Sequence, residues 1–320
     1  MRLSRLLATS CFALGLASPA LPAFAADWSK VADALGKPGT EMPGGVYRVG
    51  LPRTDLHVTL DGVELKPAFA LGSWLSFVRH GGGDQAMVMG DLVLTDDEVN
   101  PVMKRLVEGG VEITALHNHL LRNTPHTMYM HVAGHGDPVK LAATLREALA
   151  QSRTPMGNAT AGAAAQDNAA PVAGGEGGTP ARATAPDQSL GLDTAAIDRA
   201  LGRKGKVNSG VYAVGIPRAE TPKDGGMELP EAMGSAVAIN FQPTGGGRAA
   251  ITGDFVLTAE EVNPVLRALR ANGIEVTAVH NHMLDDQPRL FFMHFWANDD
   301  AAKLARGLRE ALDKVAVARS

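Results

Sequence analysis

The chain has 320 residues, of which 45% are hydrophobic and 20% charged, and its formal net charge at pH 7 is −4. This composition excludes a disordered tail protein, a collagen-like fibre and a polytopic membrane protein, and the small net charge gives no reason to expect binding to nucleic acid. At this length we expect roughly two domains, each able to bury its own core.

Residues 1–25 have the order of charge, apolar run and small residues that is typical of a secretory signal peptide. Arg2 and Arg5 precede an apolar stretch over 6–21, and Ala23 and Ala25 supply small residues before a cleavage point after residue 25. The apolar run is too short for a membrane span, and no later stretch is long enough. We therefore expect a periplasmic or secreted protein.

Cys11 is the only cysteine, and it lies within that segment. It follows Arg5 too closely to leave a normal apolar region before a lipidated cysteine, so we do not expect a lipid anchor. After cleavage the chain has neither disulfides nor thiolate ligands, and its stability must come from the packed core.

The rest of the chain contains two similar sequence repeats in tandem. The segment at 90–102 returns at 253–265, and the same spacing then holds as far as His131 and His294. We expect repeat units over 26–150 and 189–320, which pair with each other. Residues 151–188 are rich in Ala, Gly, Thr and Pro and predict a flexible linker, because such a stretch buries too little apolar surface to offset its ordering entropy.

Each unit reads as an irregular alternation of strands and helices. In chain order the first unit predicts a helix near 28–36, a strand at 45–51, a hairpin that turns at Asp61-Gly62, and strands near 68–78 and 86–94. Thr95 and Glu98 then cap a helix, which we expect to be kinked or restarted at Pro101. Strands at 111–119 and 126–133 and a helix over 138–150 complete the unit. The second unit lacks the apolar alternation of the hairpin, so we expect the hairpin only in the first.

This pattern favours the α+β class over a parallel doubly wound sheet. We expect two homologous units, each an antiparallel sheet packed under helices, that together form an intramolecular pseudo-dimer.

Six of the ten histidines recur at matching positions of the two units: His117, His119, His131, His280, His282 and His294. A His-x-His pair on a strand projects both rings to one face. A third histidine from the next strand could complete a three-nitrogen site that leaves a position open for water or substrate. Since imidazole is the commonest protein ligand for metals, the pattern predicts a divalent metal, zinc or copper.

Strand parity leaves two versions of this site open. His131 shares a strand face with Tyr129, whereas Met128 and Met130 share the other face. If the methionines faced the His-x-His pair, the ligand set would be softer and would suit copper, although Phe291 replaces Met128 in the second unit. A third interpretation is purely structural, with the rings hydrogen-bonded inside the core and no ligand present.

Other repeated polar residues are weaker candidates. Arg53 and Arg218 end matching strands and could bind a carboxylate or phosphate, although a surface ion pair is the more common role. Tyr129, on the face of His131, is a further candidate for ligand binding. Asp91 and Asp254 each follow a glycine and are expected to make turn hydrogen bonds.

Four histidines of the first unit have no counterpart in the second, and each is expected to lie at the surface: His57, His80, His126 and His135. They make the first unit the better candidate for an active copy, with the second as its structural partner.

The repeated segments Gly-Asp-Leu-Val-Leu, Glu-Val-Asn-Pro-Val, Thr-Ala-Leu-His-Asn-His-Leu-Leu and Met-Tyr-Met-His resemble the LppY/LpqO family of exported bacterial proteins. The resemblance covers roughly 27–150 and 189–315. It implies an envelope or secreted location and a domain of unknown function, and it brings no reaction, substrate or cofactor.

The leading hypothesis is therefore an exported protein that binds a divalent metal or a small ligand through His-x-His plus a third histidine. One alternative is an enzyme, a metal-assisted hydrolase or lyase that acts on a small envelope molecule. Another is a structural or interaction module without metal. The sequence identifies no catalytic residue.

Overall fold

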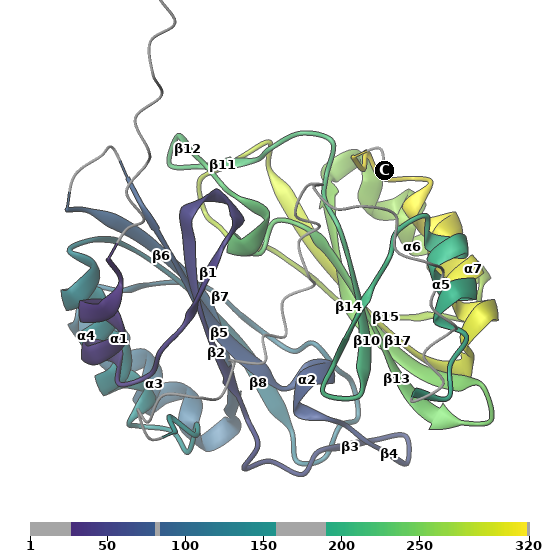
Figure 1. Ribbon diagram of the computed structural model, residues 1–320, viewed down its shortest axis with the longest axis horizontal. Helices are drawn as coiled ribbons and strands as arrows, with labels where there is room; N and C mark the ends of the chain where they lie inside the picture. The colour runs from purple at the N-terminus through teal and green to yellow at the C-terminus, as the bar shows by residue number, and fades with distance from the viewer. Residues whose placement is uncertain (1–26, 81–83, 158–189, 319–320) are drawn as a thin grey trace, which may run out of the picture.

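The computed structural model describes residues 27–80, 84–157 and 190–318. The predicted signal segment and most of the predicted linker lie outside these residues. Within them the chain forms two halves of the same architecture, each an antiparallel six-stranded sheet with helices on one side (Figure 1). The predicted α+β class with two similar units is confirmed.

In the first half, residues 27–157, the elements are α1 (Ser29–Leu35), β1 (Thr40–Met42), the 3-10 turn η1 (Pro43–Gly45), β2 (Val46–Pro52), β3 (Thr59–Leu60), β4 (Val63–Glu64), α2 (Pro67–Ala70), β5 (Gly72–Arg79), β6 (Ala86–Thr95), α3 (Asp96–Glu108), β7 (Glu112–His117), β8 (Thr127–Gly136) and α4 (Pro138–Leu149). The strand order of the sheet is β1-β2-β5-β6-β8-β7.

In the second half, residues 190–318, the elements are α5 (Thr194–Leu201), β9 (Lys206–Asn208), β10 (Val211–Ile216), β11 (Lys223–Asp224), β12 (Met227–Glu228), η3 (Glu231–Met233), β13 (Val237–Gly245), β14 (Arg248–Thr258), α6 (Ala259–Ala271), β15 (Glu275–His280), β16 (Asp286–Gln287), β17 (Leu290–Asp300) and α7 (Ala301–Leu312). The strand order β15-β17-β14-β13-β10-β9 repeats that of the first sheet, with β15 matching β7 and β17 matching β8.

Helices cover the outer face of each sheet, and the two inner faces turn toward each other (Figure 1). α1, α3 and α4 pack on the first sheet through one apolar cluster, and α5, α6 and α7 pack on the second through another. A third cluster contains residues of both halves, and in it the ring of Phe69 meets Trp296 edge-on at 6.2 Å. Apolar burial therefore joins the two sheets face to face.

Reciprocal hydrogen bonds also join the halves beside this cluster. The Asn118 side chain donates to the backbone oxygen of Thr277 at 3.2 Å, and Asn281 donates to that of Thr114 at 2.9 Å. Because Asn118 and Asn281 occupy matching positions, these bonds relate the halves by a pseudo-twofold axis.

The structure refines several local expectations. The second half does have a hairpin, β11–β12, which turns at Gly225 and Gly226. The strand expected near 68–78 begins only at Gly72, because Pro67–Ala70 form α2. Of the two alternatives at Pro101 the restart does not occur, because α3 is one helix through that residue. The first half extends past residue 150, because the Arg153 N–H donates to the Glu98 carboxylate at 2.8 Å.

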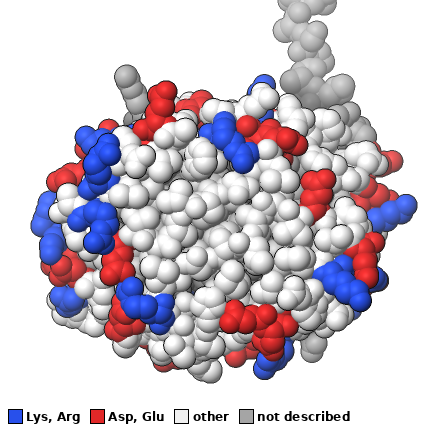
Figure 2. Space-filling model, turned by 180° about the vertical axis from the view of Figure 1, so that it is seen from behind, with Lys and Arg blue, Asp and Glu red and all other residues white. Residues whose placement is uncertain are grey.

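The surface of the molecule shows no large field of one sign on the face seen from behind. Figure 2 shows that basic and acidic side chains alternate around the rim of this face, while its centre is uncharged. Within the described ranges, none of the helices combines the length and the apolar character of a membrane span.

Candidate metal centre

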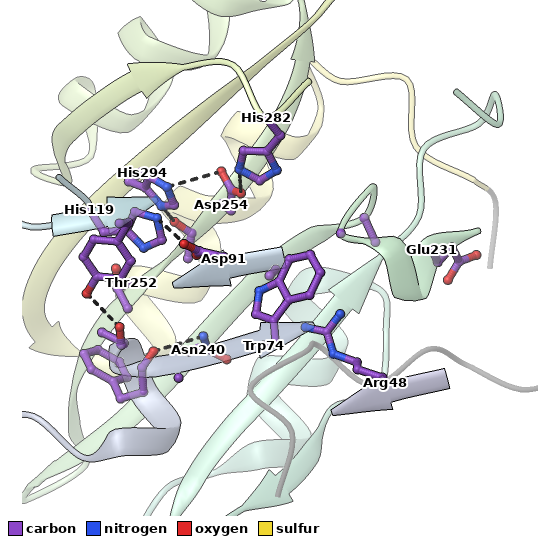
Figure 3. A pocket seen from close by; sticks show the side chains of 18 residues that line it. Arg48, Trp74, Asp91, His119, Glu231, Asn240, Thr252, Asp254, His282 and His294 are labelled. Carbon is purple, nitrogen blue, oxygen red and sulfur yellow. Dashed lines mark hydrogen bonds and ion pairs between the residues drawn. The ribbon is translucent and has the colours of Figure 1, made fainter. Parts of the chain in front are cut away.

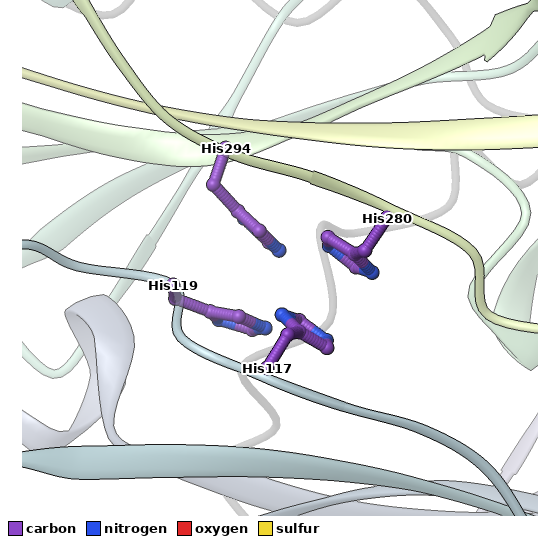
Figure 4. Close-up of side chains that lie close together, drawn as sticks. All are labelled: His117, His119, His280 and His294. Carbon is purple, nitrogen blue, oxygen red and sulfur yellow. The ribbon is translucent and has the colours of Figure 1, made fainter.

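The six repeated histidines meet between the two sheets, at the place where β7 and β15 approach each other. Four of them lie together as one group, with all ligand atoms within 4.8 Å of one another: His117, His119, His280 and His294 (Figure 4). His131 forms a second group with His280 and His282 under the same limit, and a third group consists of Asp91, His119 and His131, all of the first half.

This arrangement differs from the predicted one in its choice of partners. In the two groups made of histidines alone, the His-x-His pair of one half meets the third histidine of the other half: His294 joins His117 and His119, and His131 joins His280 and His282. The physical reason is the face-to-face packing of the sheets. Both halves therefore contribute histidines to two of the three groups, and the third group belongs to the first half.

The histidine rings are packed in stacks that link the halves. The ring centroids of His117 and His280 lie 3.4 Å apart, and those of His119 and His294 lie 3.6 Å apart. Tyr129 stacks on His119 at 3.4 Å, and its phenol donates to the backbone oxygen of Ala70 at 2.8 Å. Tyr129 thus forms a wall of the site.

Backbone carbonyls fix which ring nitrogen remains available. The Nδ1 atoms of His117 and His280 lie 3.0 Å from the backbone oxygens of the asparagines that follow them, and Nδ1 of His294 lies 2.7 Å from that of Gly253. A carbonyl only accepts, so each Nδ1 carries the proton and each Nε2 keeps a lone pair. This is the tautomer that an Nε2 metal ligand requires.

The available nitrogens make no hydrogen bonds among the described residues. Nε2 is buried and without a hydrogen bond in all six histidines, His117, His119, His131, His280, His282 and His294. One carboxylate oxygen of Asp91 and one of Asp254 are likewise buried without a hydrogen bond. Buried polar atoms without partners are rare, because each costs about 1–3 kcal/mol.

Asp91 and Asp254 are site residues that the sequence reasoning missed. They lie inside β6 and β14 and not in turns, and their carboxylates approach the His-x-His pairs. Asp91 Oδ2 is 3.7 Å from His119 Nε2, and Asp254 Oδ2 is 3.4 Å from His282 Nε2. Their matching positions in the repeat were the available signal.

Burial governs the ionisation of the whole group. It raises the pKa of Asp91 to about 8 and that of Asp254 well above its ordinary value. It also lowers the pKa of His117 to about 4 and that of His280 to about 3. The other four histidines shift down as well, so at neutral pH the imidazoles are neutral and able to bind a cation.

Gly253 allows the strands beside the site to approach closely. A Cβ at this position would lie 1.9 Å from the backbone oxygen of Ala238, so only glycine fits. The same glycine supplies the carbonyl that fixes His294.

Arg53 and Arg218 do not reach the site, and the structure gives them another role. The Arg53 guanidinium is fully buried and bonds to Asp55 and Glu98 at 2.8 Å each. Arg218 makes the equivalent bonds to Glu220 and Glu261. Their donors are used within each half, so neither the predicted ligand binding nor the surface ion pair describes them.

The methionine version of the site is wrong. Met130 is fully buried in the cluster beneath the helices, and Met128 packs on the same cluster. Residues on a strand alternate between faces, so Tyr129 and His131 face the other half instead.

The remaining histidines of the first half are surface residues, as expected. They are His57, His80, His126 and His135, and all are exposed. His57 and His126 contact the exposed carboxylates of Glu64 and Asp96.

A cavity of about 130 Å³ opens beside the histidines; we call it the interhalf cavity (Figure 3). Its labelled lining residues are Arg48, Trp74, Asp91, His119, Glu231, Asn240, Thr252, Asp254, His282 and His294. Both halves therefore contribute to it, and ligand atoms of the histidine group border it. An ion held by these residues would be reachable from the cavity.

Comparison with known proteins places the chain in a family. No curated protein matches it. A trimeric bacterial microcompartment shell protein, PduB, is 12% identical, with 87% of this chain and 93% of that chain covered and a TM-score of 0.22. A likeness at this score carries no argument. The model of the family described as Domain of Unknown Function (DUF1259) matches residues 29–151 and 195–314, which is more than half of the chain, so the chain belongs to this family and contains its domain twice.

Proposed function

We propose that this protein binds a divalent metal ion between its two halves, with ligands from both. The observation that carries the proposal is the gathering of six buried Nε2 atoms, none of which makes a hydrogen bond within the described chain. The carboxylates of Asp91 and Asp254 lie 3.4–3.9 Å from three of these atoms. The tautomers fixed at His117, His280 and His294 each leave the Nε2 lone pair free to bind a cation.

A purely structural role accounts less well for this group. Histidines that only complete core hydrogen bonds would have both nitrogens paired, whereas here only the Nδ1 side is anchored. Leaving the facing atoms unpaired costs free energy at every ring, and a bound cation removes that cost.

The chemistry of the ligands favours zinc or copper. The groups offer imidazole nitrogens and the Asp91 carboxylate, no cysteine of the described residues joins them, and Met128 and Met130 lie on the other face of their strand. Such nitrogen-rich sets suit Zn²⁺ and Cu²⁺, whereas Mg²⁺ and Ca²⁺ prefer oxygen ligands.

Elemental analysis of the purified full chain tests the proposal. We expect metal to copurify with the wild type and to be lost in the double variant His117→Ala/His280→Ala, which removes the stacked pair at the centre. The control is His57→Ala/His126→Ala, which removes two exposed histidines and should retain the metal.

Thermal unfolding gives an independent measurement. Zinc or copper should raise the melting temperature of the wild type and the control but not that of the central double variant, because only a folded state that binds the ion is stabilised. Negligible metal in the wild type, or equal retention in both double variants, would overturn the proposal.

One observation favours a metal-assisted enzyme as the second candidate. The interhalf cavity borders both His119 and Asp254, so a small molecule in it would reach the ion. A hydrolase or lyase would activate water at that position. Turnover that disappears on chelation and returns with zinc is the result that would support it.

Export remains a further proposal, supported by the pattern of residues 1–25 and by the likeness to the LppY/LpqO family. Mass spectrometry of the protein from its native cells should give a chain that begins near Ala26. An intact amino terminus in a cytoplasmic fraction would contradict this.

A further inference from the structure

The two halves line the interhalf cavity with different chemistry. The ligand residues occur in matching pairs, but the cavity walls do not. Strand register matches Arg48 with Ala213 and Trp74 with Ala238. The first half thus has a cation and a flat aromatic ring at positions where the second half has the small side chain of alanine.

Trp74 is held in place by its neighbours. The guanidinium of Arg48 lies 4.0 Å from the centre of the Trp74 ring, and its Nη1 donates to the backbone oxygen of Ala232 at 2.7 Å. Gly234 packs against the edge of the indole and has a φ of +89°. A Cβ at this position would lie 3.0 Å from the ring. A wall fixed in this way binds a flat molecule at little cost in ordering entropy.

Arg48 places a positive charge on the wall of the cavity. It is only 2% exposed, so its charge is weakly screened. Glu231, on the η3 turn, is half-buried and carries the opposite charge. A divalent ion held by the histidines would add positive charge at the edge of the cavity. A carboxylate is the organic anion that can also occupy a metal position.

The volume limits the size of the ligand. A cavity of about 130 Å³ is smaller than the roughly 300–1,000 Å³ of pockets that take drug-sized molecules. A single ring with one substituent is within this limit.

We propose that the interhalf cavity binds a small aromatic carboxylate, with a carboxylate oxygen on the metal and the ring against Trp74. The proposal rests on the metal centre proposed above. His119 and His294 belong to the four-histidine group and also line the cavity, so an ion held by that group would lie at the edge of the cavity. Arg48 would stabilise both the anion and the position of Trp74.

Calorimetry with benzoate, benzamide and cyclohexanecarboxylate tests the proposal on the full chain, both zinc-loaded and stripped with chelator. Benzoate should bind the loaded chain roughly tenfold or more tightly than benzamide, which lacks the charge. Cyclohexanecarboxylate, which is not flat, should bind more weakly than benzoate. Stripping the zinc should weaken benzoate binding.

Two variants locate the binding in this cavity. Ala238→Leu adds bulk to the cavity wall without removing a ligand residue, so it should abolish benzoate binding and leave the zinc content unchanged. Arg48→Met should weaken benzoate binding by roughly tenfold. Its matched control is Arg79→Met, because Arg79 also lies over a tryptophan, Trp28 at 4.9 Å, but does not line the cavity.

The outcomes separate this proposal from the metal proposal. If the chain holds zinc but does not distinguish benzoate from benzamide, or if Ala238→Leu binds benzoate as the wild type does, the ligand proposal is overturned and the metal centre stands. If the wild type takes up no zinc, both are overturned. Should Arg48→Met fail to fold, Ala238→Leu decides alone.

Discussion

At the residue scale, His294 tests whether the centre is shared. It lies on β17 in the second half, yet its ligand atom groups with those of His117 and His119 in the first. We predict that His294→Ala lowers zinc affinity by roughly 10- to 100-fold, the range seen when a supporting residue of a metal site is removed. Competition with a chromophoric chelator measures the change.

The control for His294→Ala is His135→Ala, an exposed histidine on β8. It should bind zinc as the wild type does. If His294→Ala matched this control, His294 would not be a ligand of the ion.

Arg53 gives a second prediction at this scale, because its role is structural. Arg53→Met leaves the buried Glu98 without its main partner, and losing one partner of a buried pair costs about 3–5 kcal/mol. We expect this loss in the free energy of unfolding, measured by urea denaturation, with unchanged zinc per folded molecule.

Arg105→Met is the matched control for Arg53→Met. Arg105 pairs with Glu147 at the surface, where an ion pair contributes about 0–1 kcal/mol. Loss of zinc in folded Arg53→Met would instead restore a ligand-binding role for Arg53.

These residues also show what the sequence could predict. Because side chains in a strand alternate between its two faces, the sequence predicted that both rings of each His-x-His pair share a face, and each pair does lie in one group. The partners of Arg53 could not be found in this way, because Glu98 lies on α3 and meets Arg53 only in the folded sheet. Asp91 was missed for the same reason, since its burial depends on the opposite half.

At the scale of elements, Glu98 links the start of α3 to the sheet. It accepts hydrogen bonds from Arg53 and from the Thr95 N–H. Burial raises its pKa, but hydrogen bonds from Arg53 and from the backbone outweigh burial, and the net shift is downward. A carboxyl whose pKa is lowered by folding stabilises the fold above its unfolded pKa and loses that contribution as pH falls through the folded value.

We therefore predict that wild type and Glu98→Gln differ most in melting temperature near pH 6 and converge as the pH falls from the ordinary pKa of a glutamate through the lowered pKa of Glu98 in the folded protein. Thermal unfolding of both proteins across this range measures the difference, and subtracting the two curves removes the other titrating groups. A difference that stayed constant down to pH 3 would mean that the Glu98 charge contributes nothing.

Local signals predicted most elements, and the second hairpin shows where they failed. The capping pair Thr95 and Glu98 and the alternation of the strands depend on neighbouring residues, so the sequence was enough. β11–β12 has no apolar alternation, and its strand β11 pairs with the distant β16. Its formation depends on tertiary contact, which a local pattern does not contain.

At the scale of the whole molecule, the duplication could be predicted from the sequence, but the contacts between histidines of different halves could not. The repeat predicted two similar units that pair, and its period carried no information on which faces meet. Face-to-face packing then placed His294 beside His117, a contact between residues of different halves. The two groups made of histidines alone therefore arise from the pairing of the halves and not from either unit by itself.

The two halves hold together through contacts between their own surfaces. If the halves associate through their own surfaces, cutting the chain between them should not separate them. Cross-half bonds such as Asn118 to Thr277 and Asn281 to Thr114, together with the apolar cluster around Phe69 and Trp296, do not involve the connecting segment. A protease site inserted between residues 157 and 190 should give two fragments that elute together in gel filtration. They should retain zinc, because each pair of histidines still meets its partner from the other half. Fragments that separate while one of them keeps the full zinc content would show that the centre belongs to a single half.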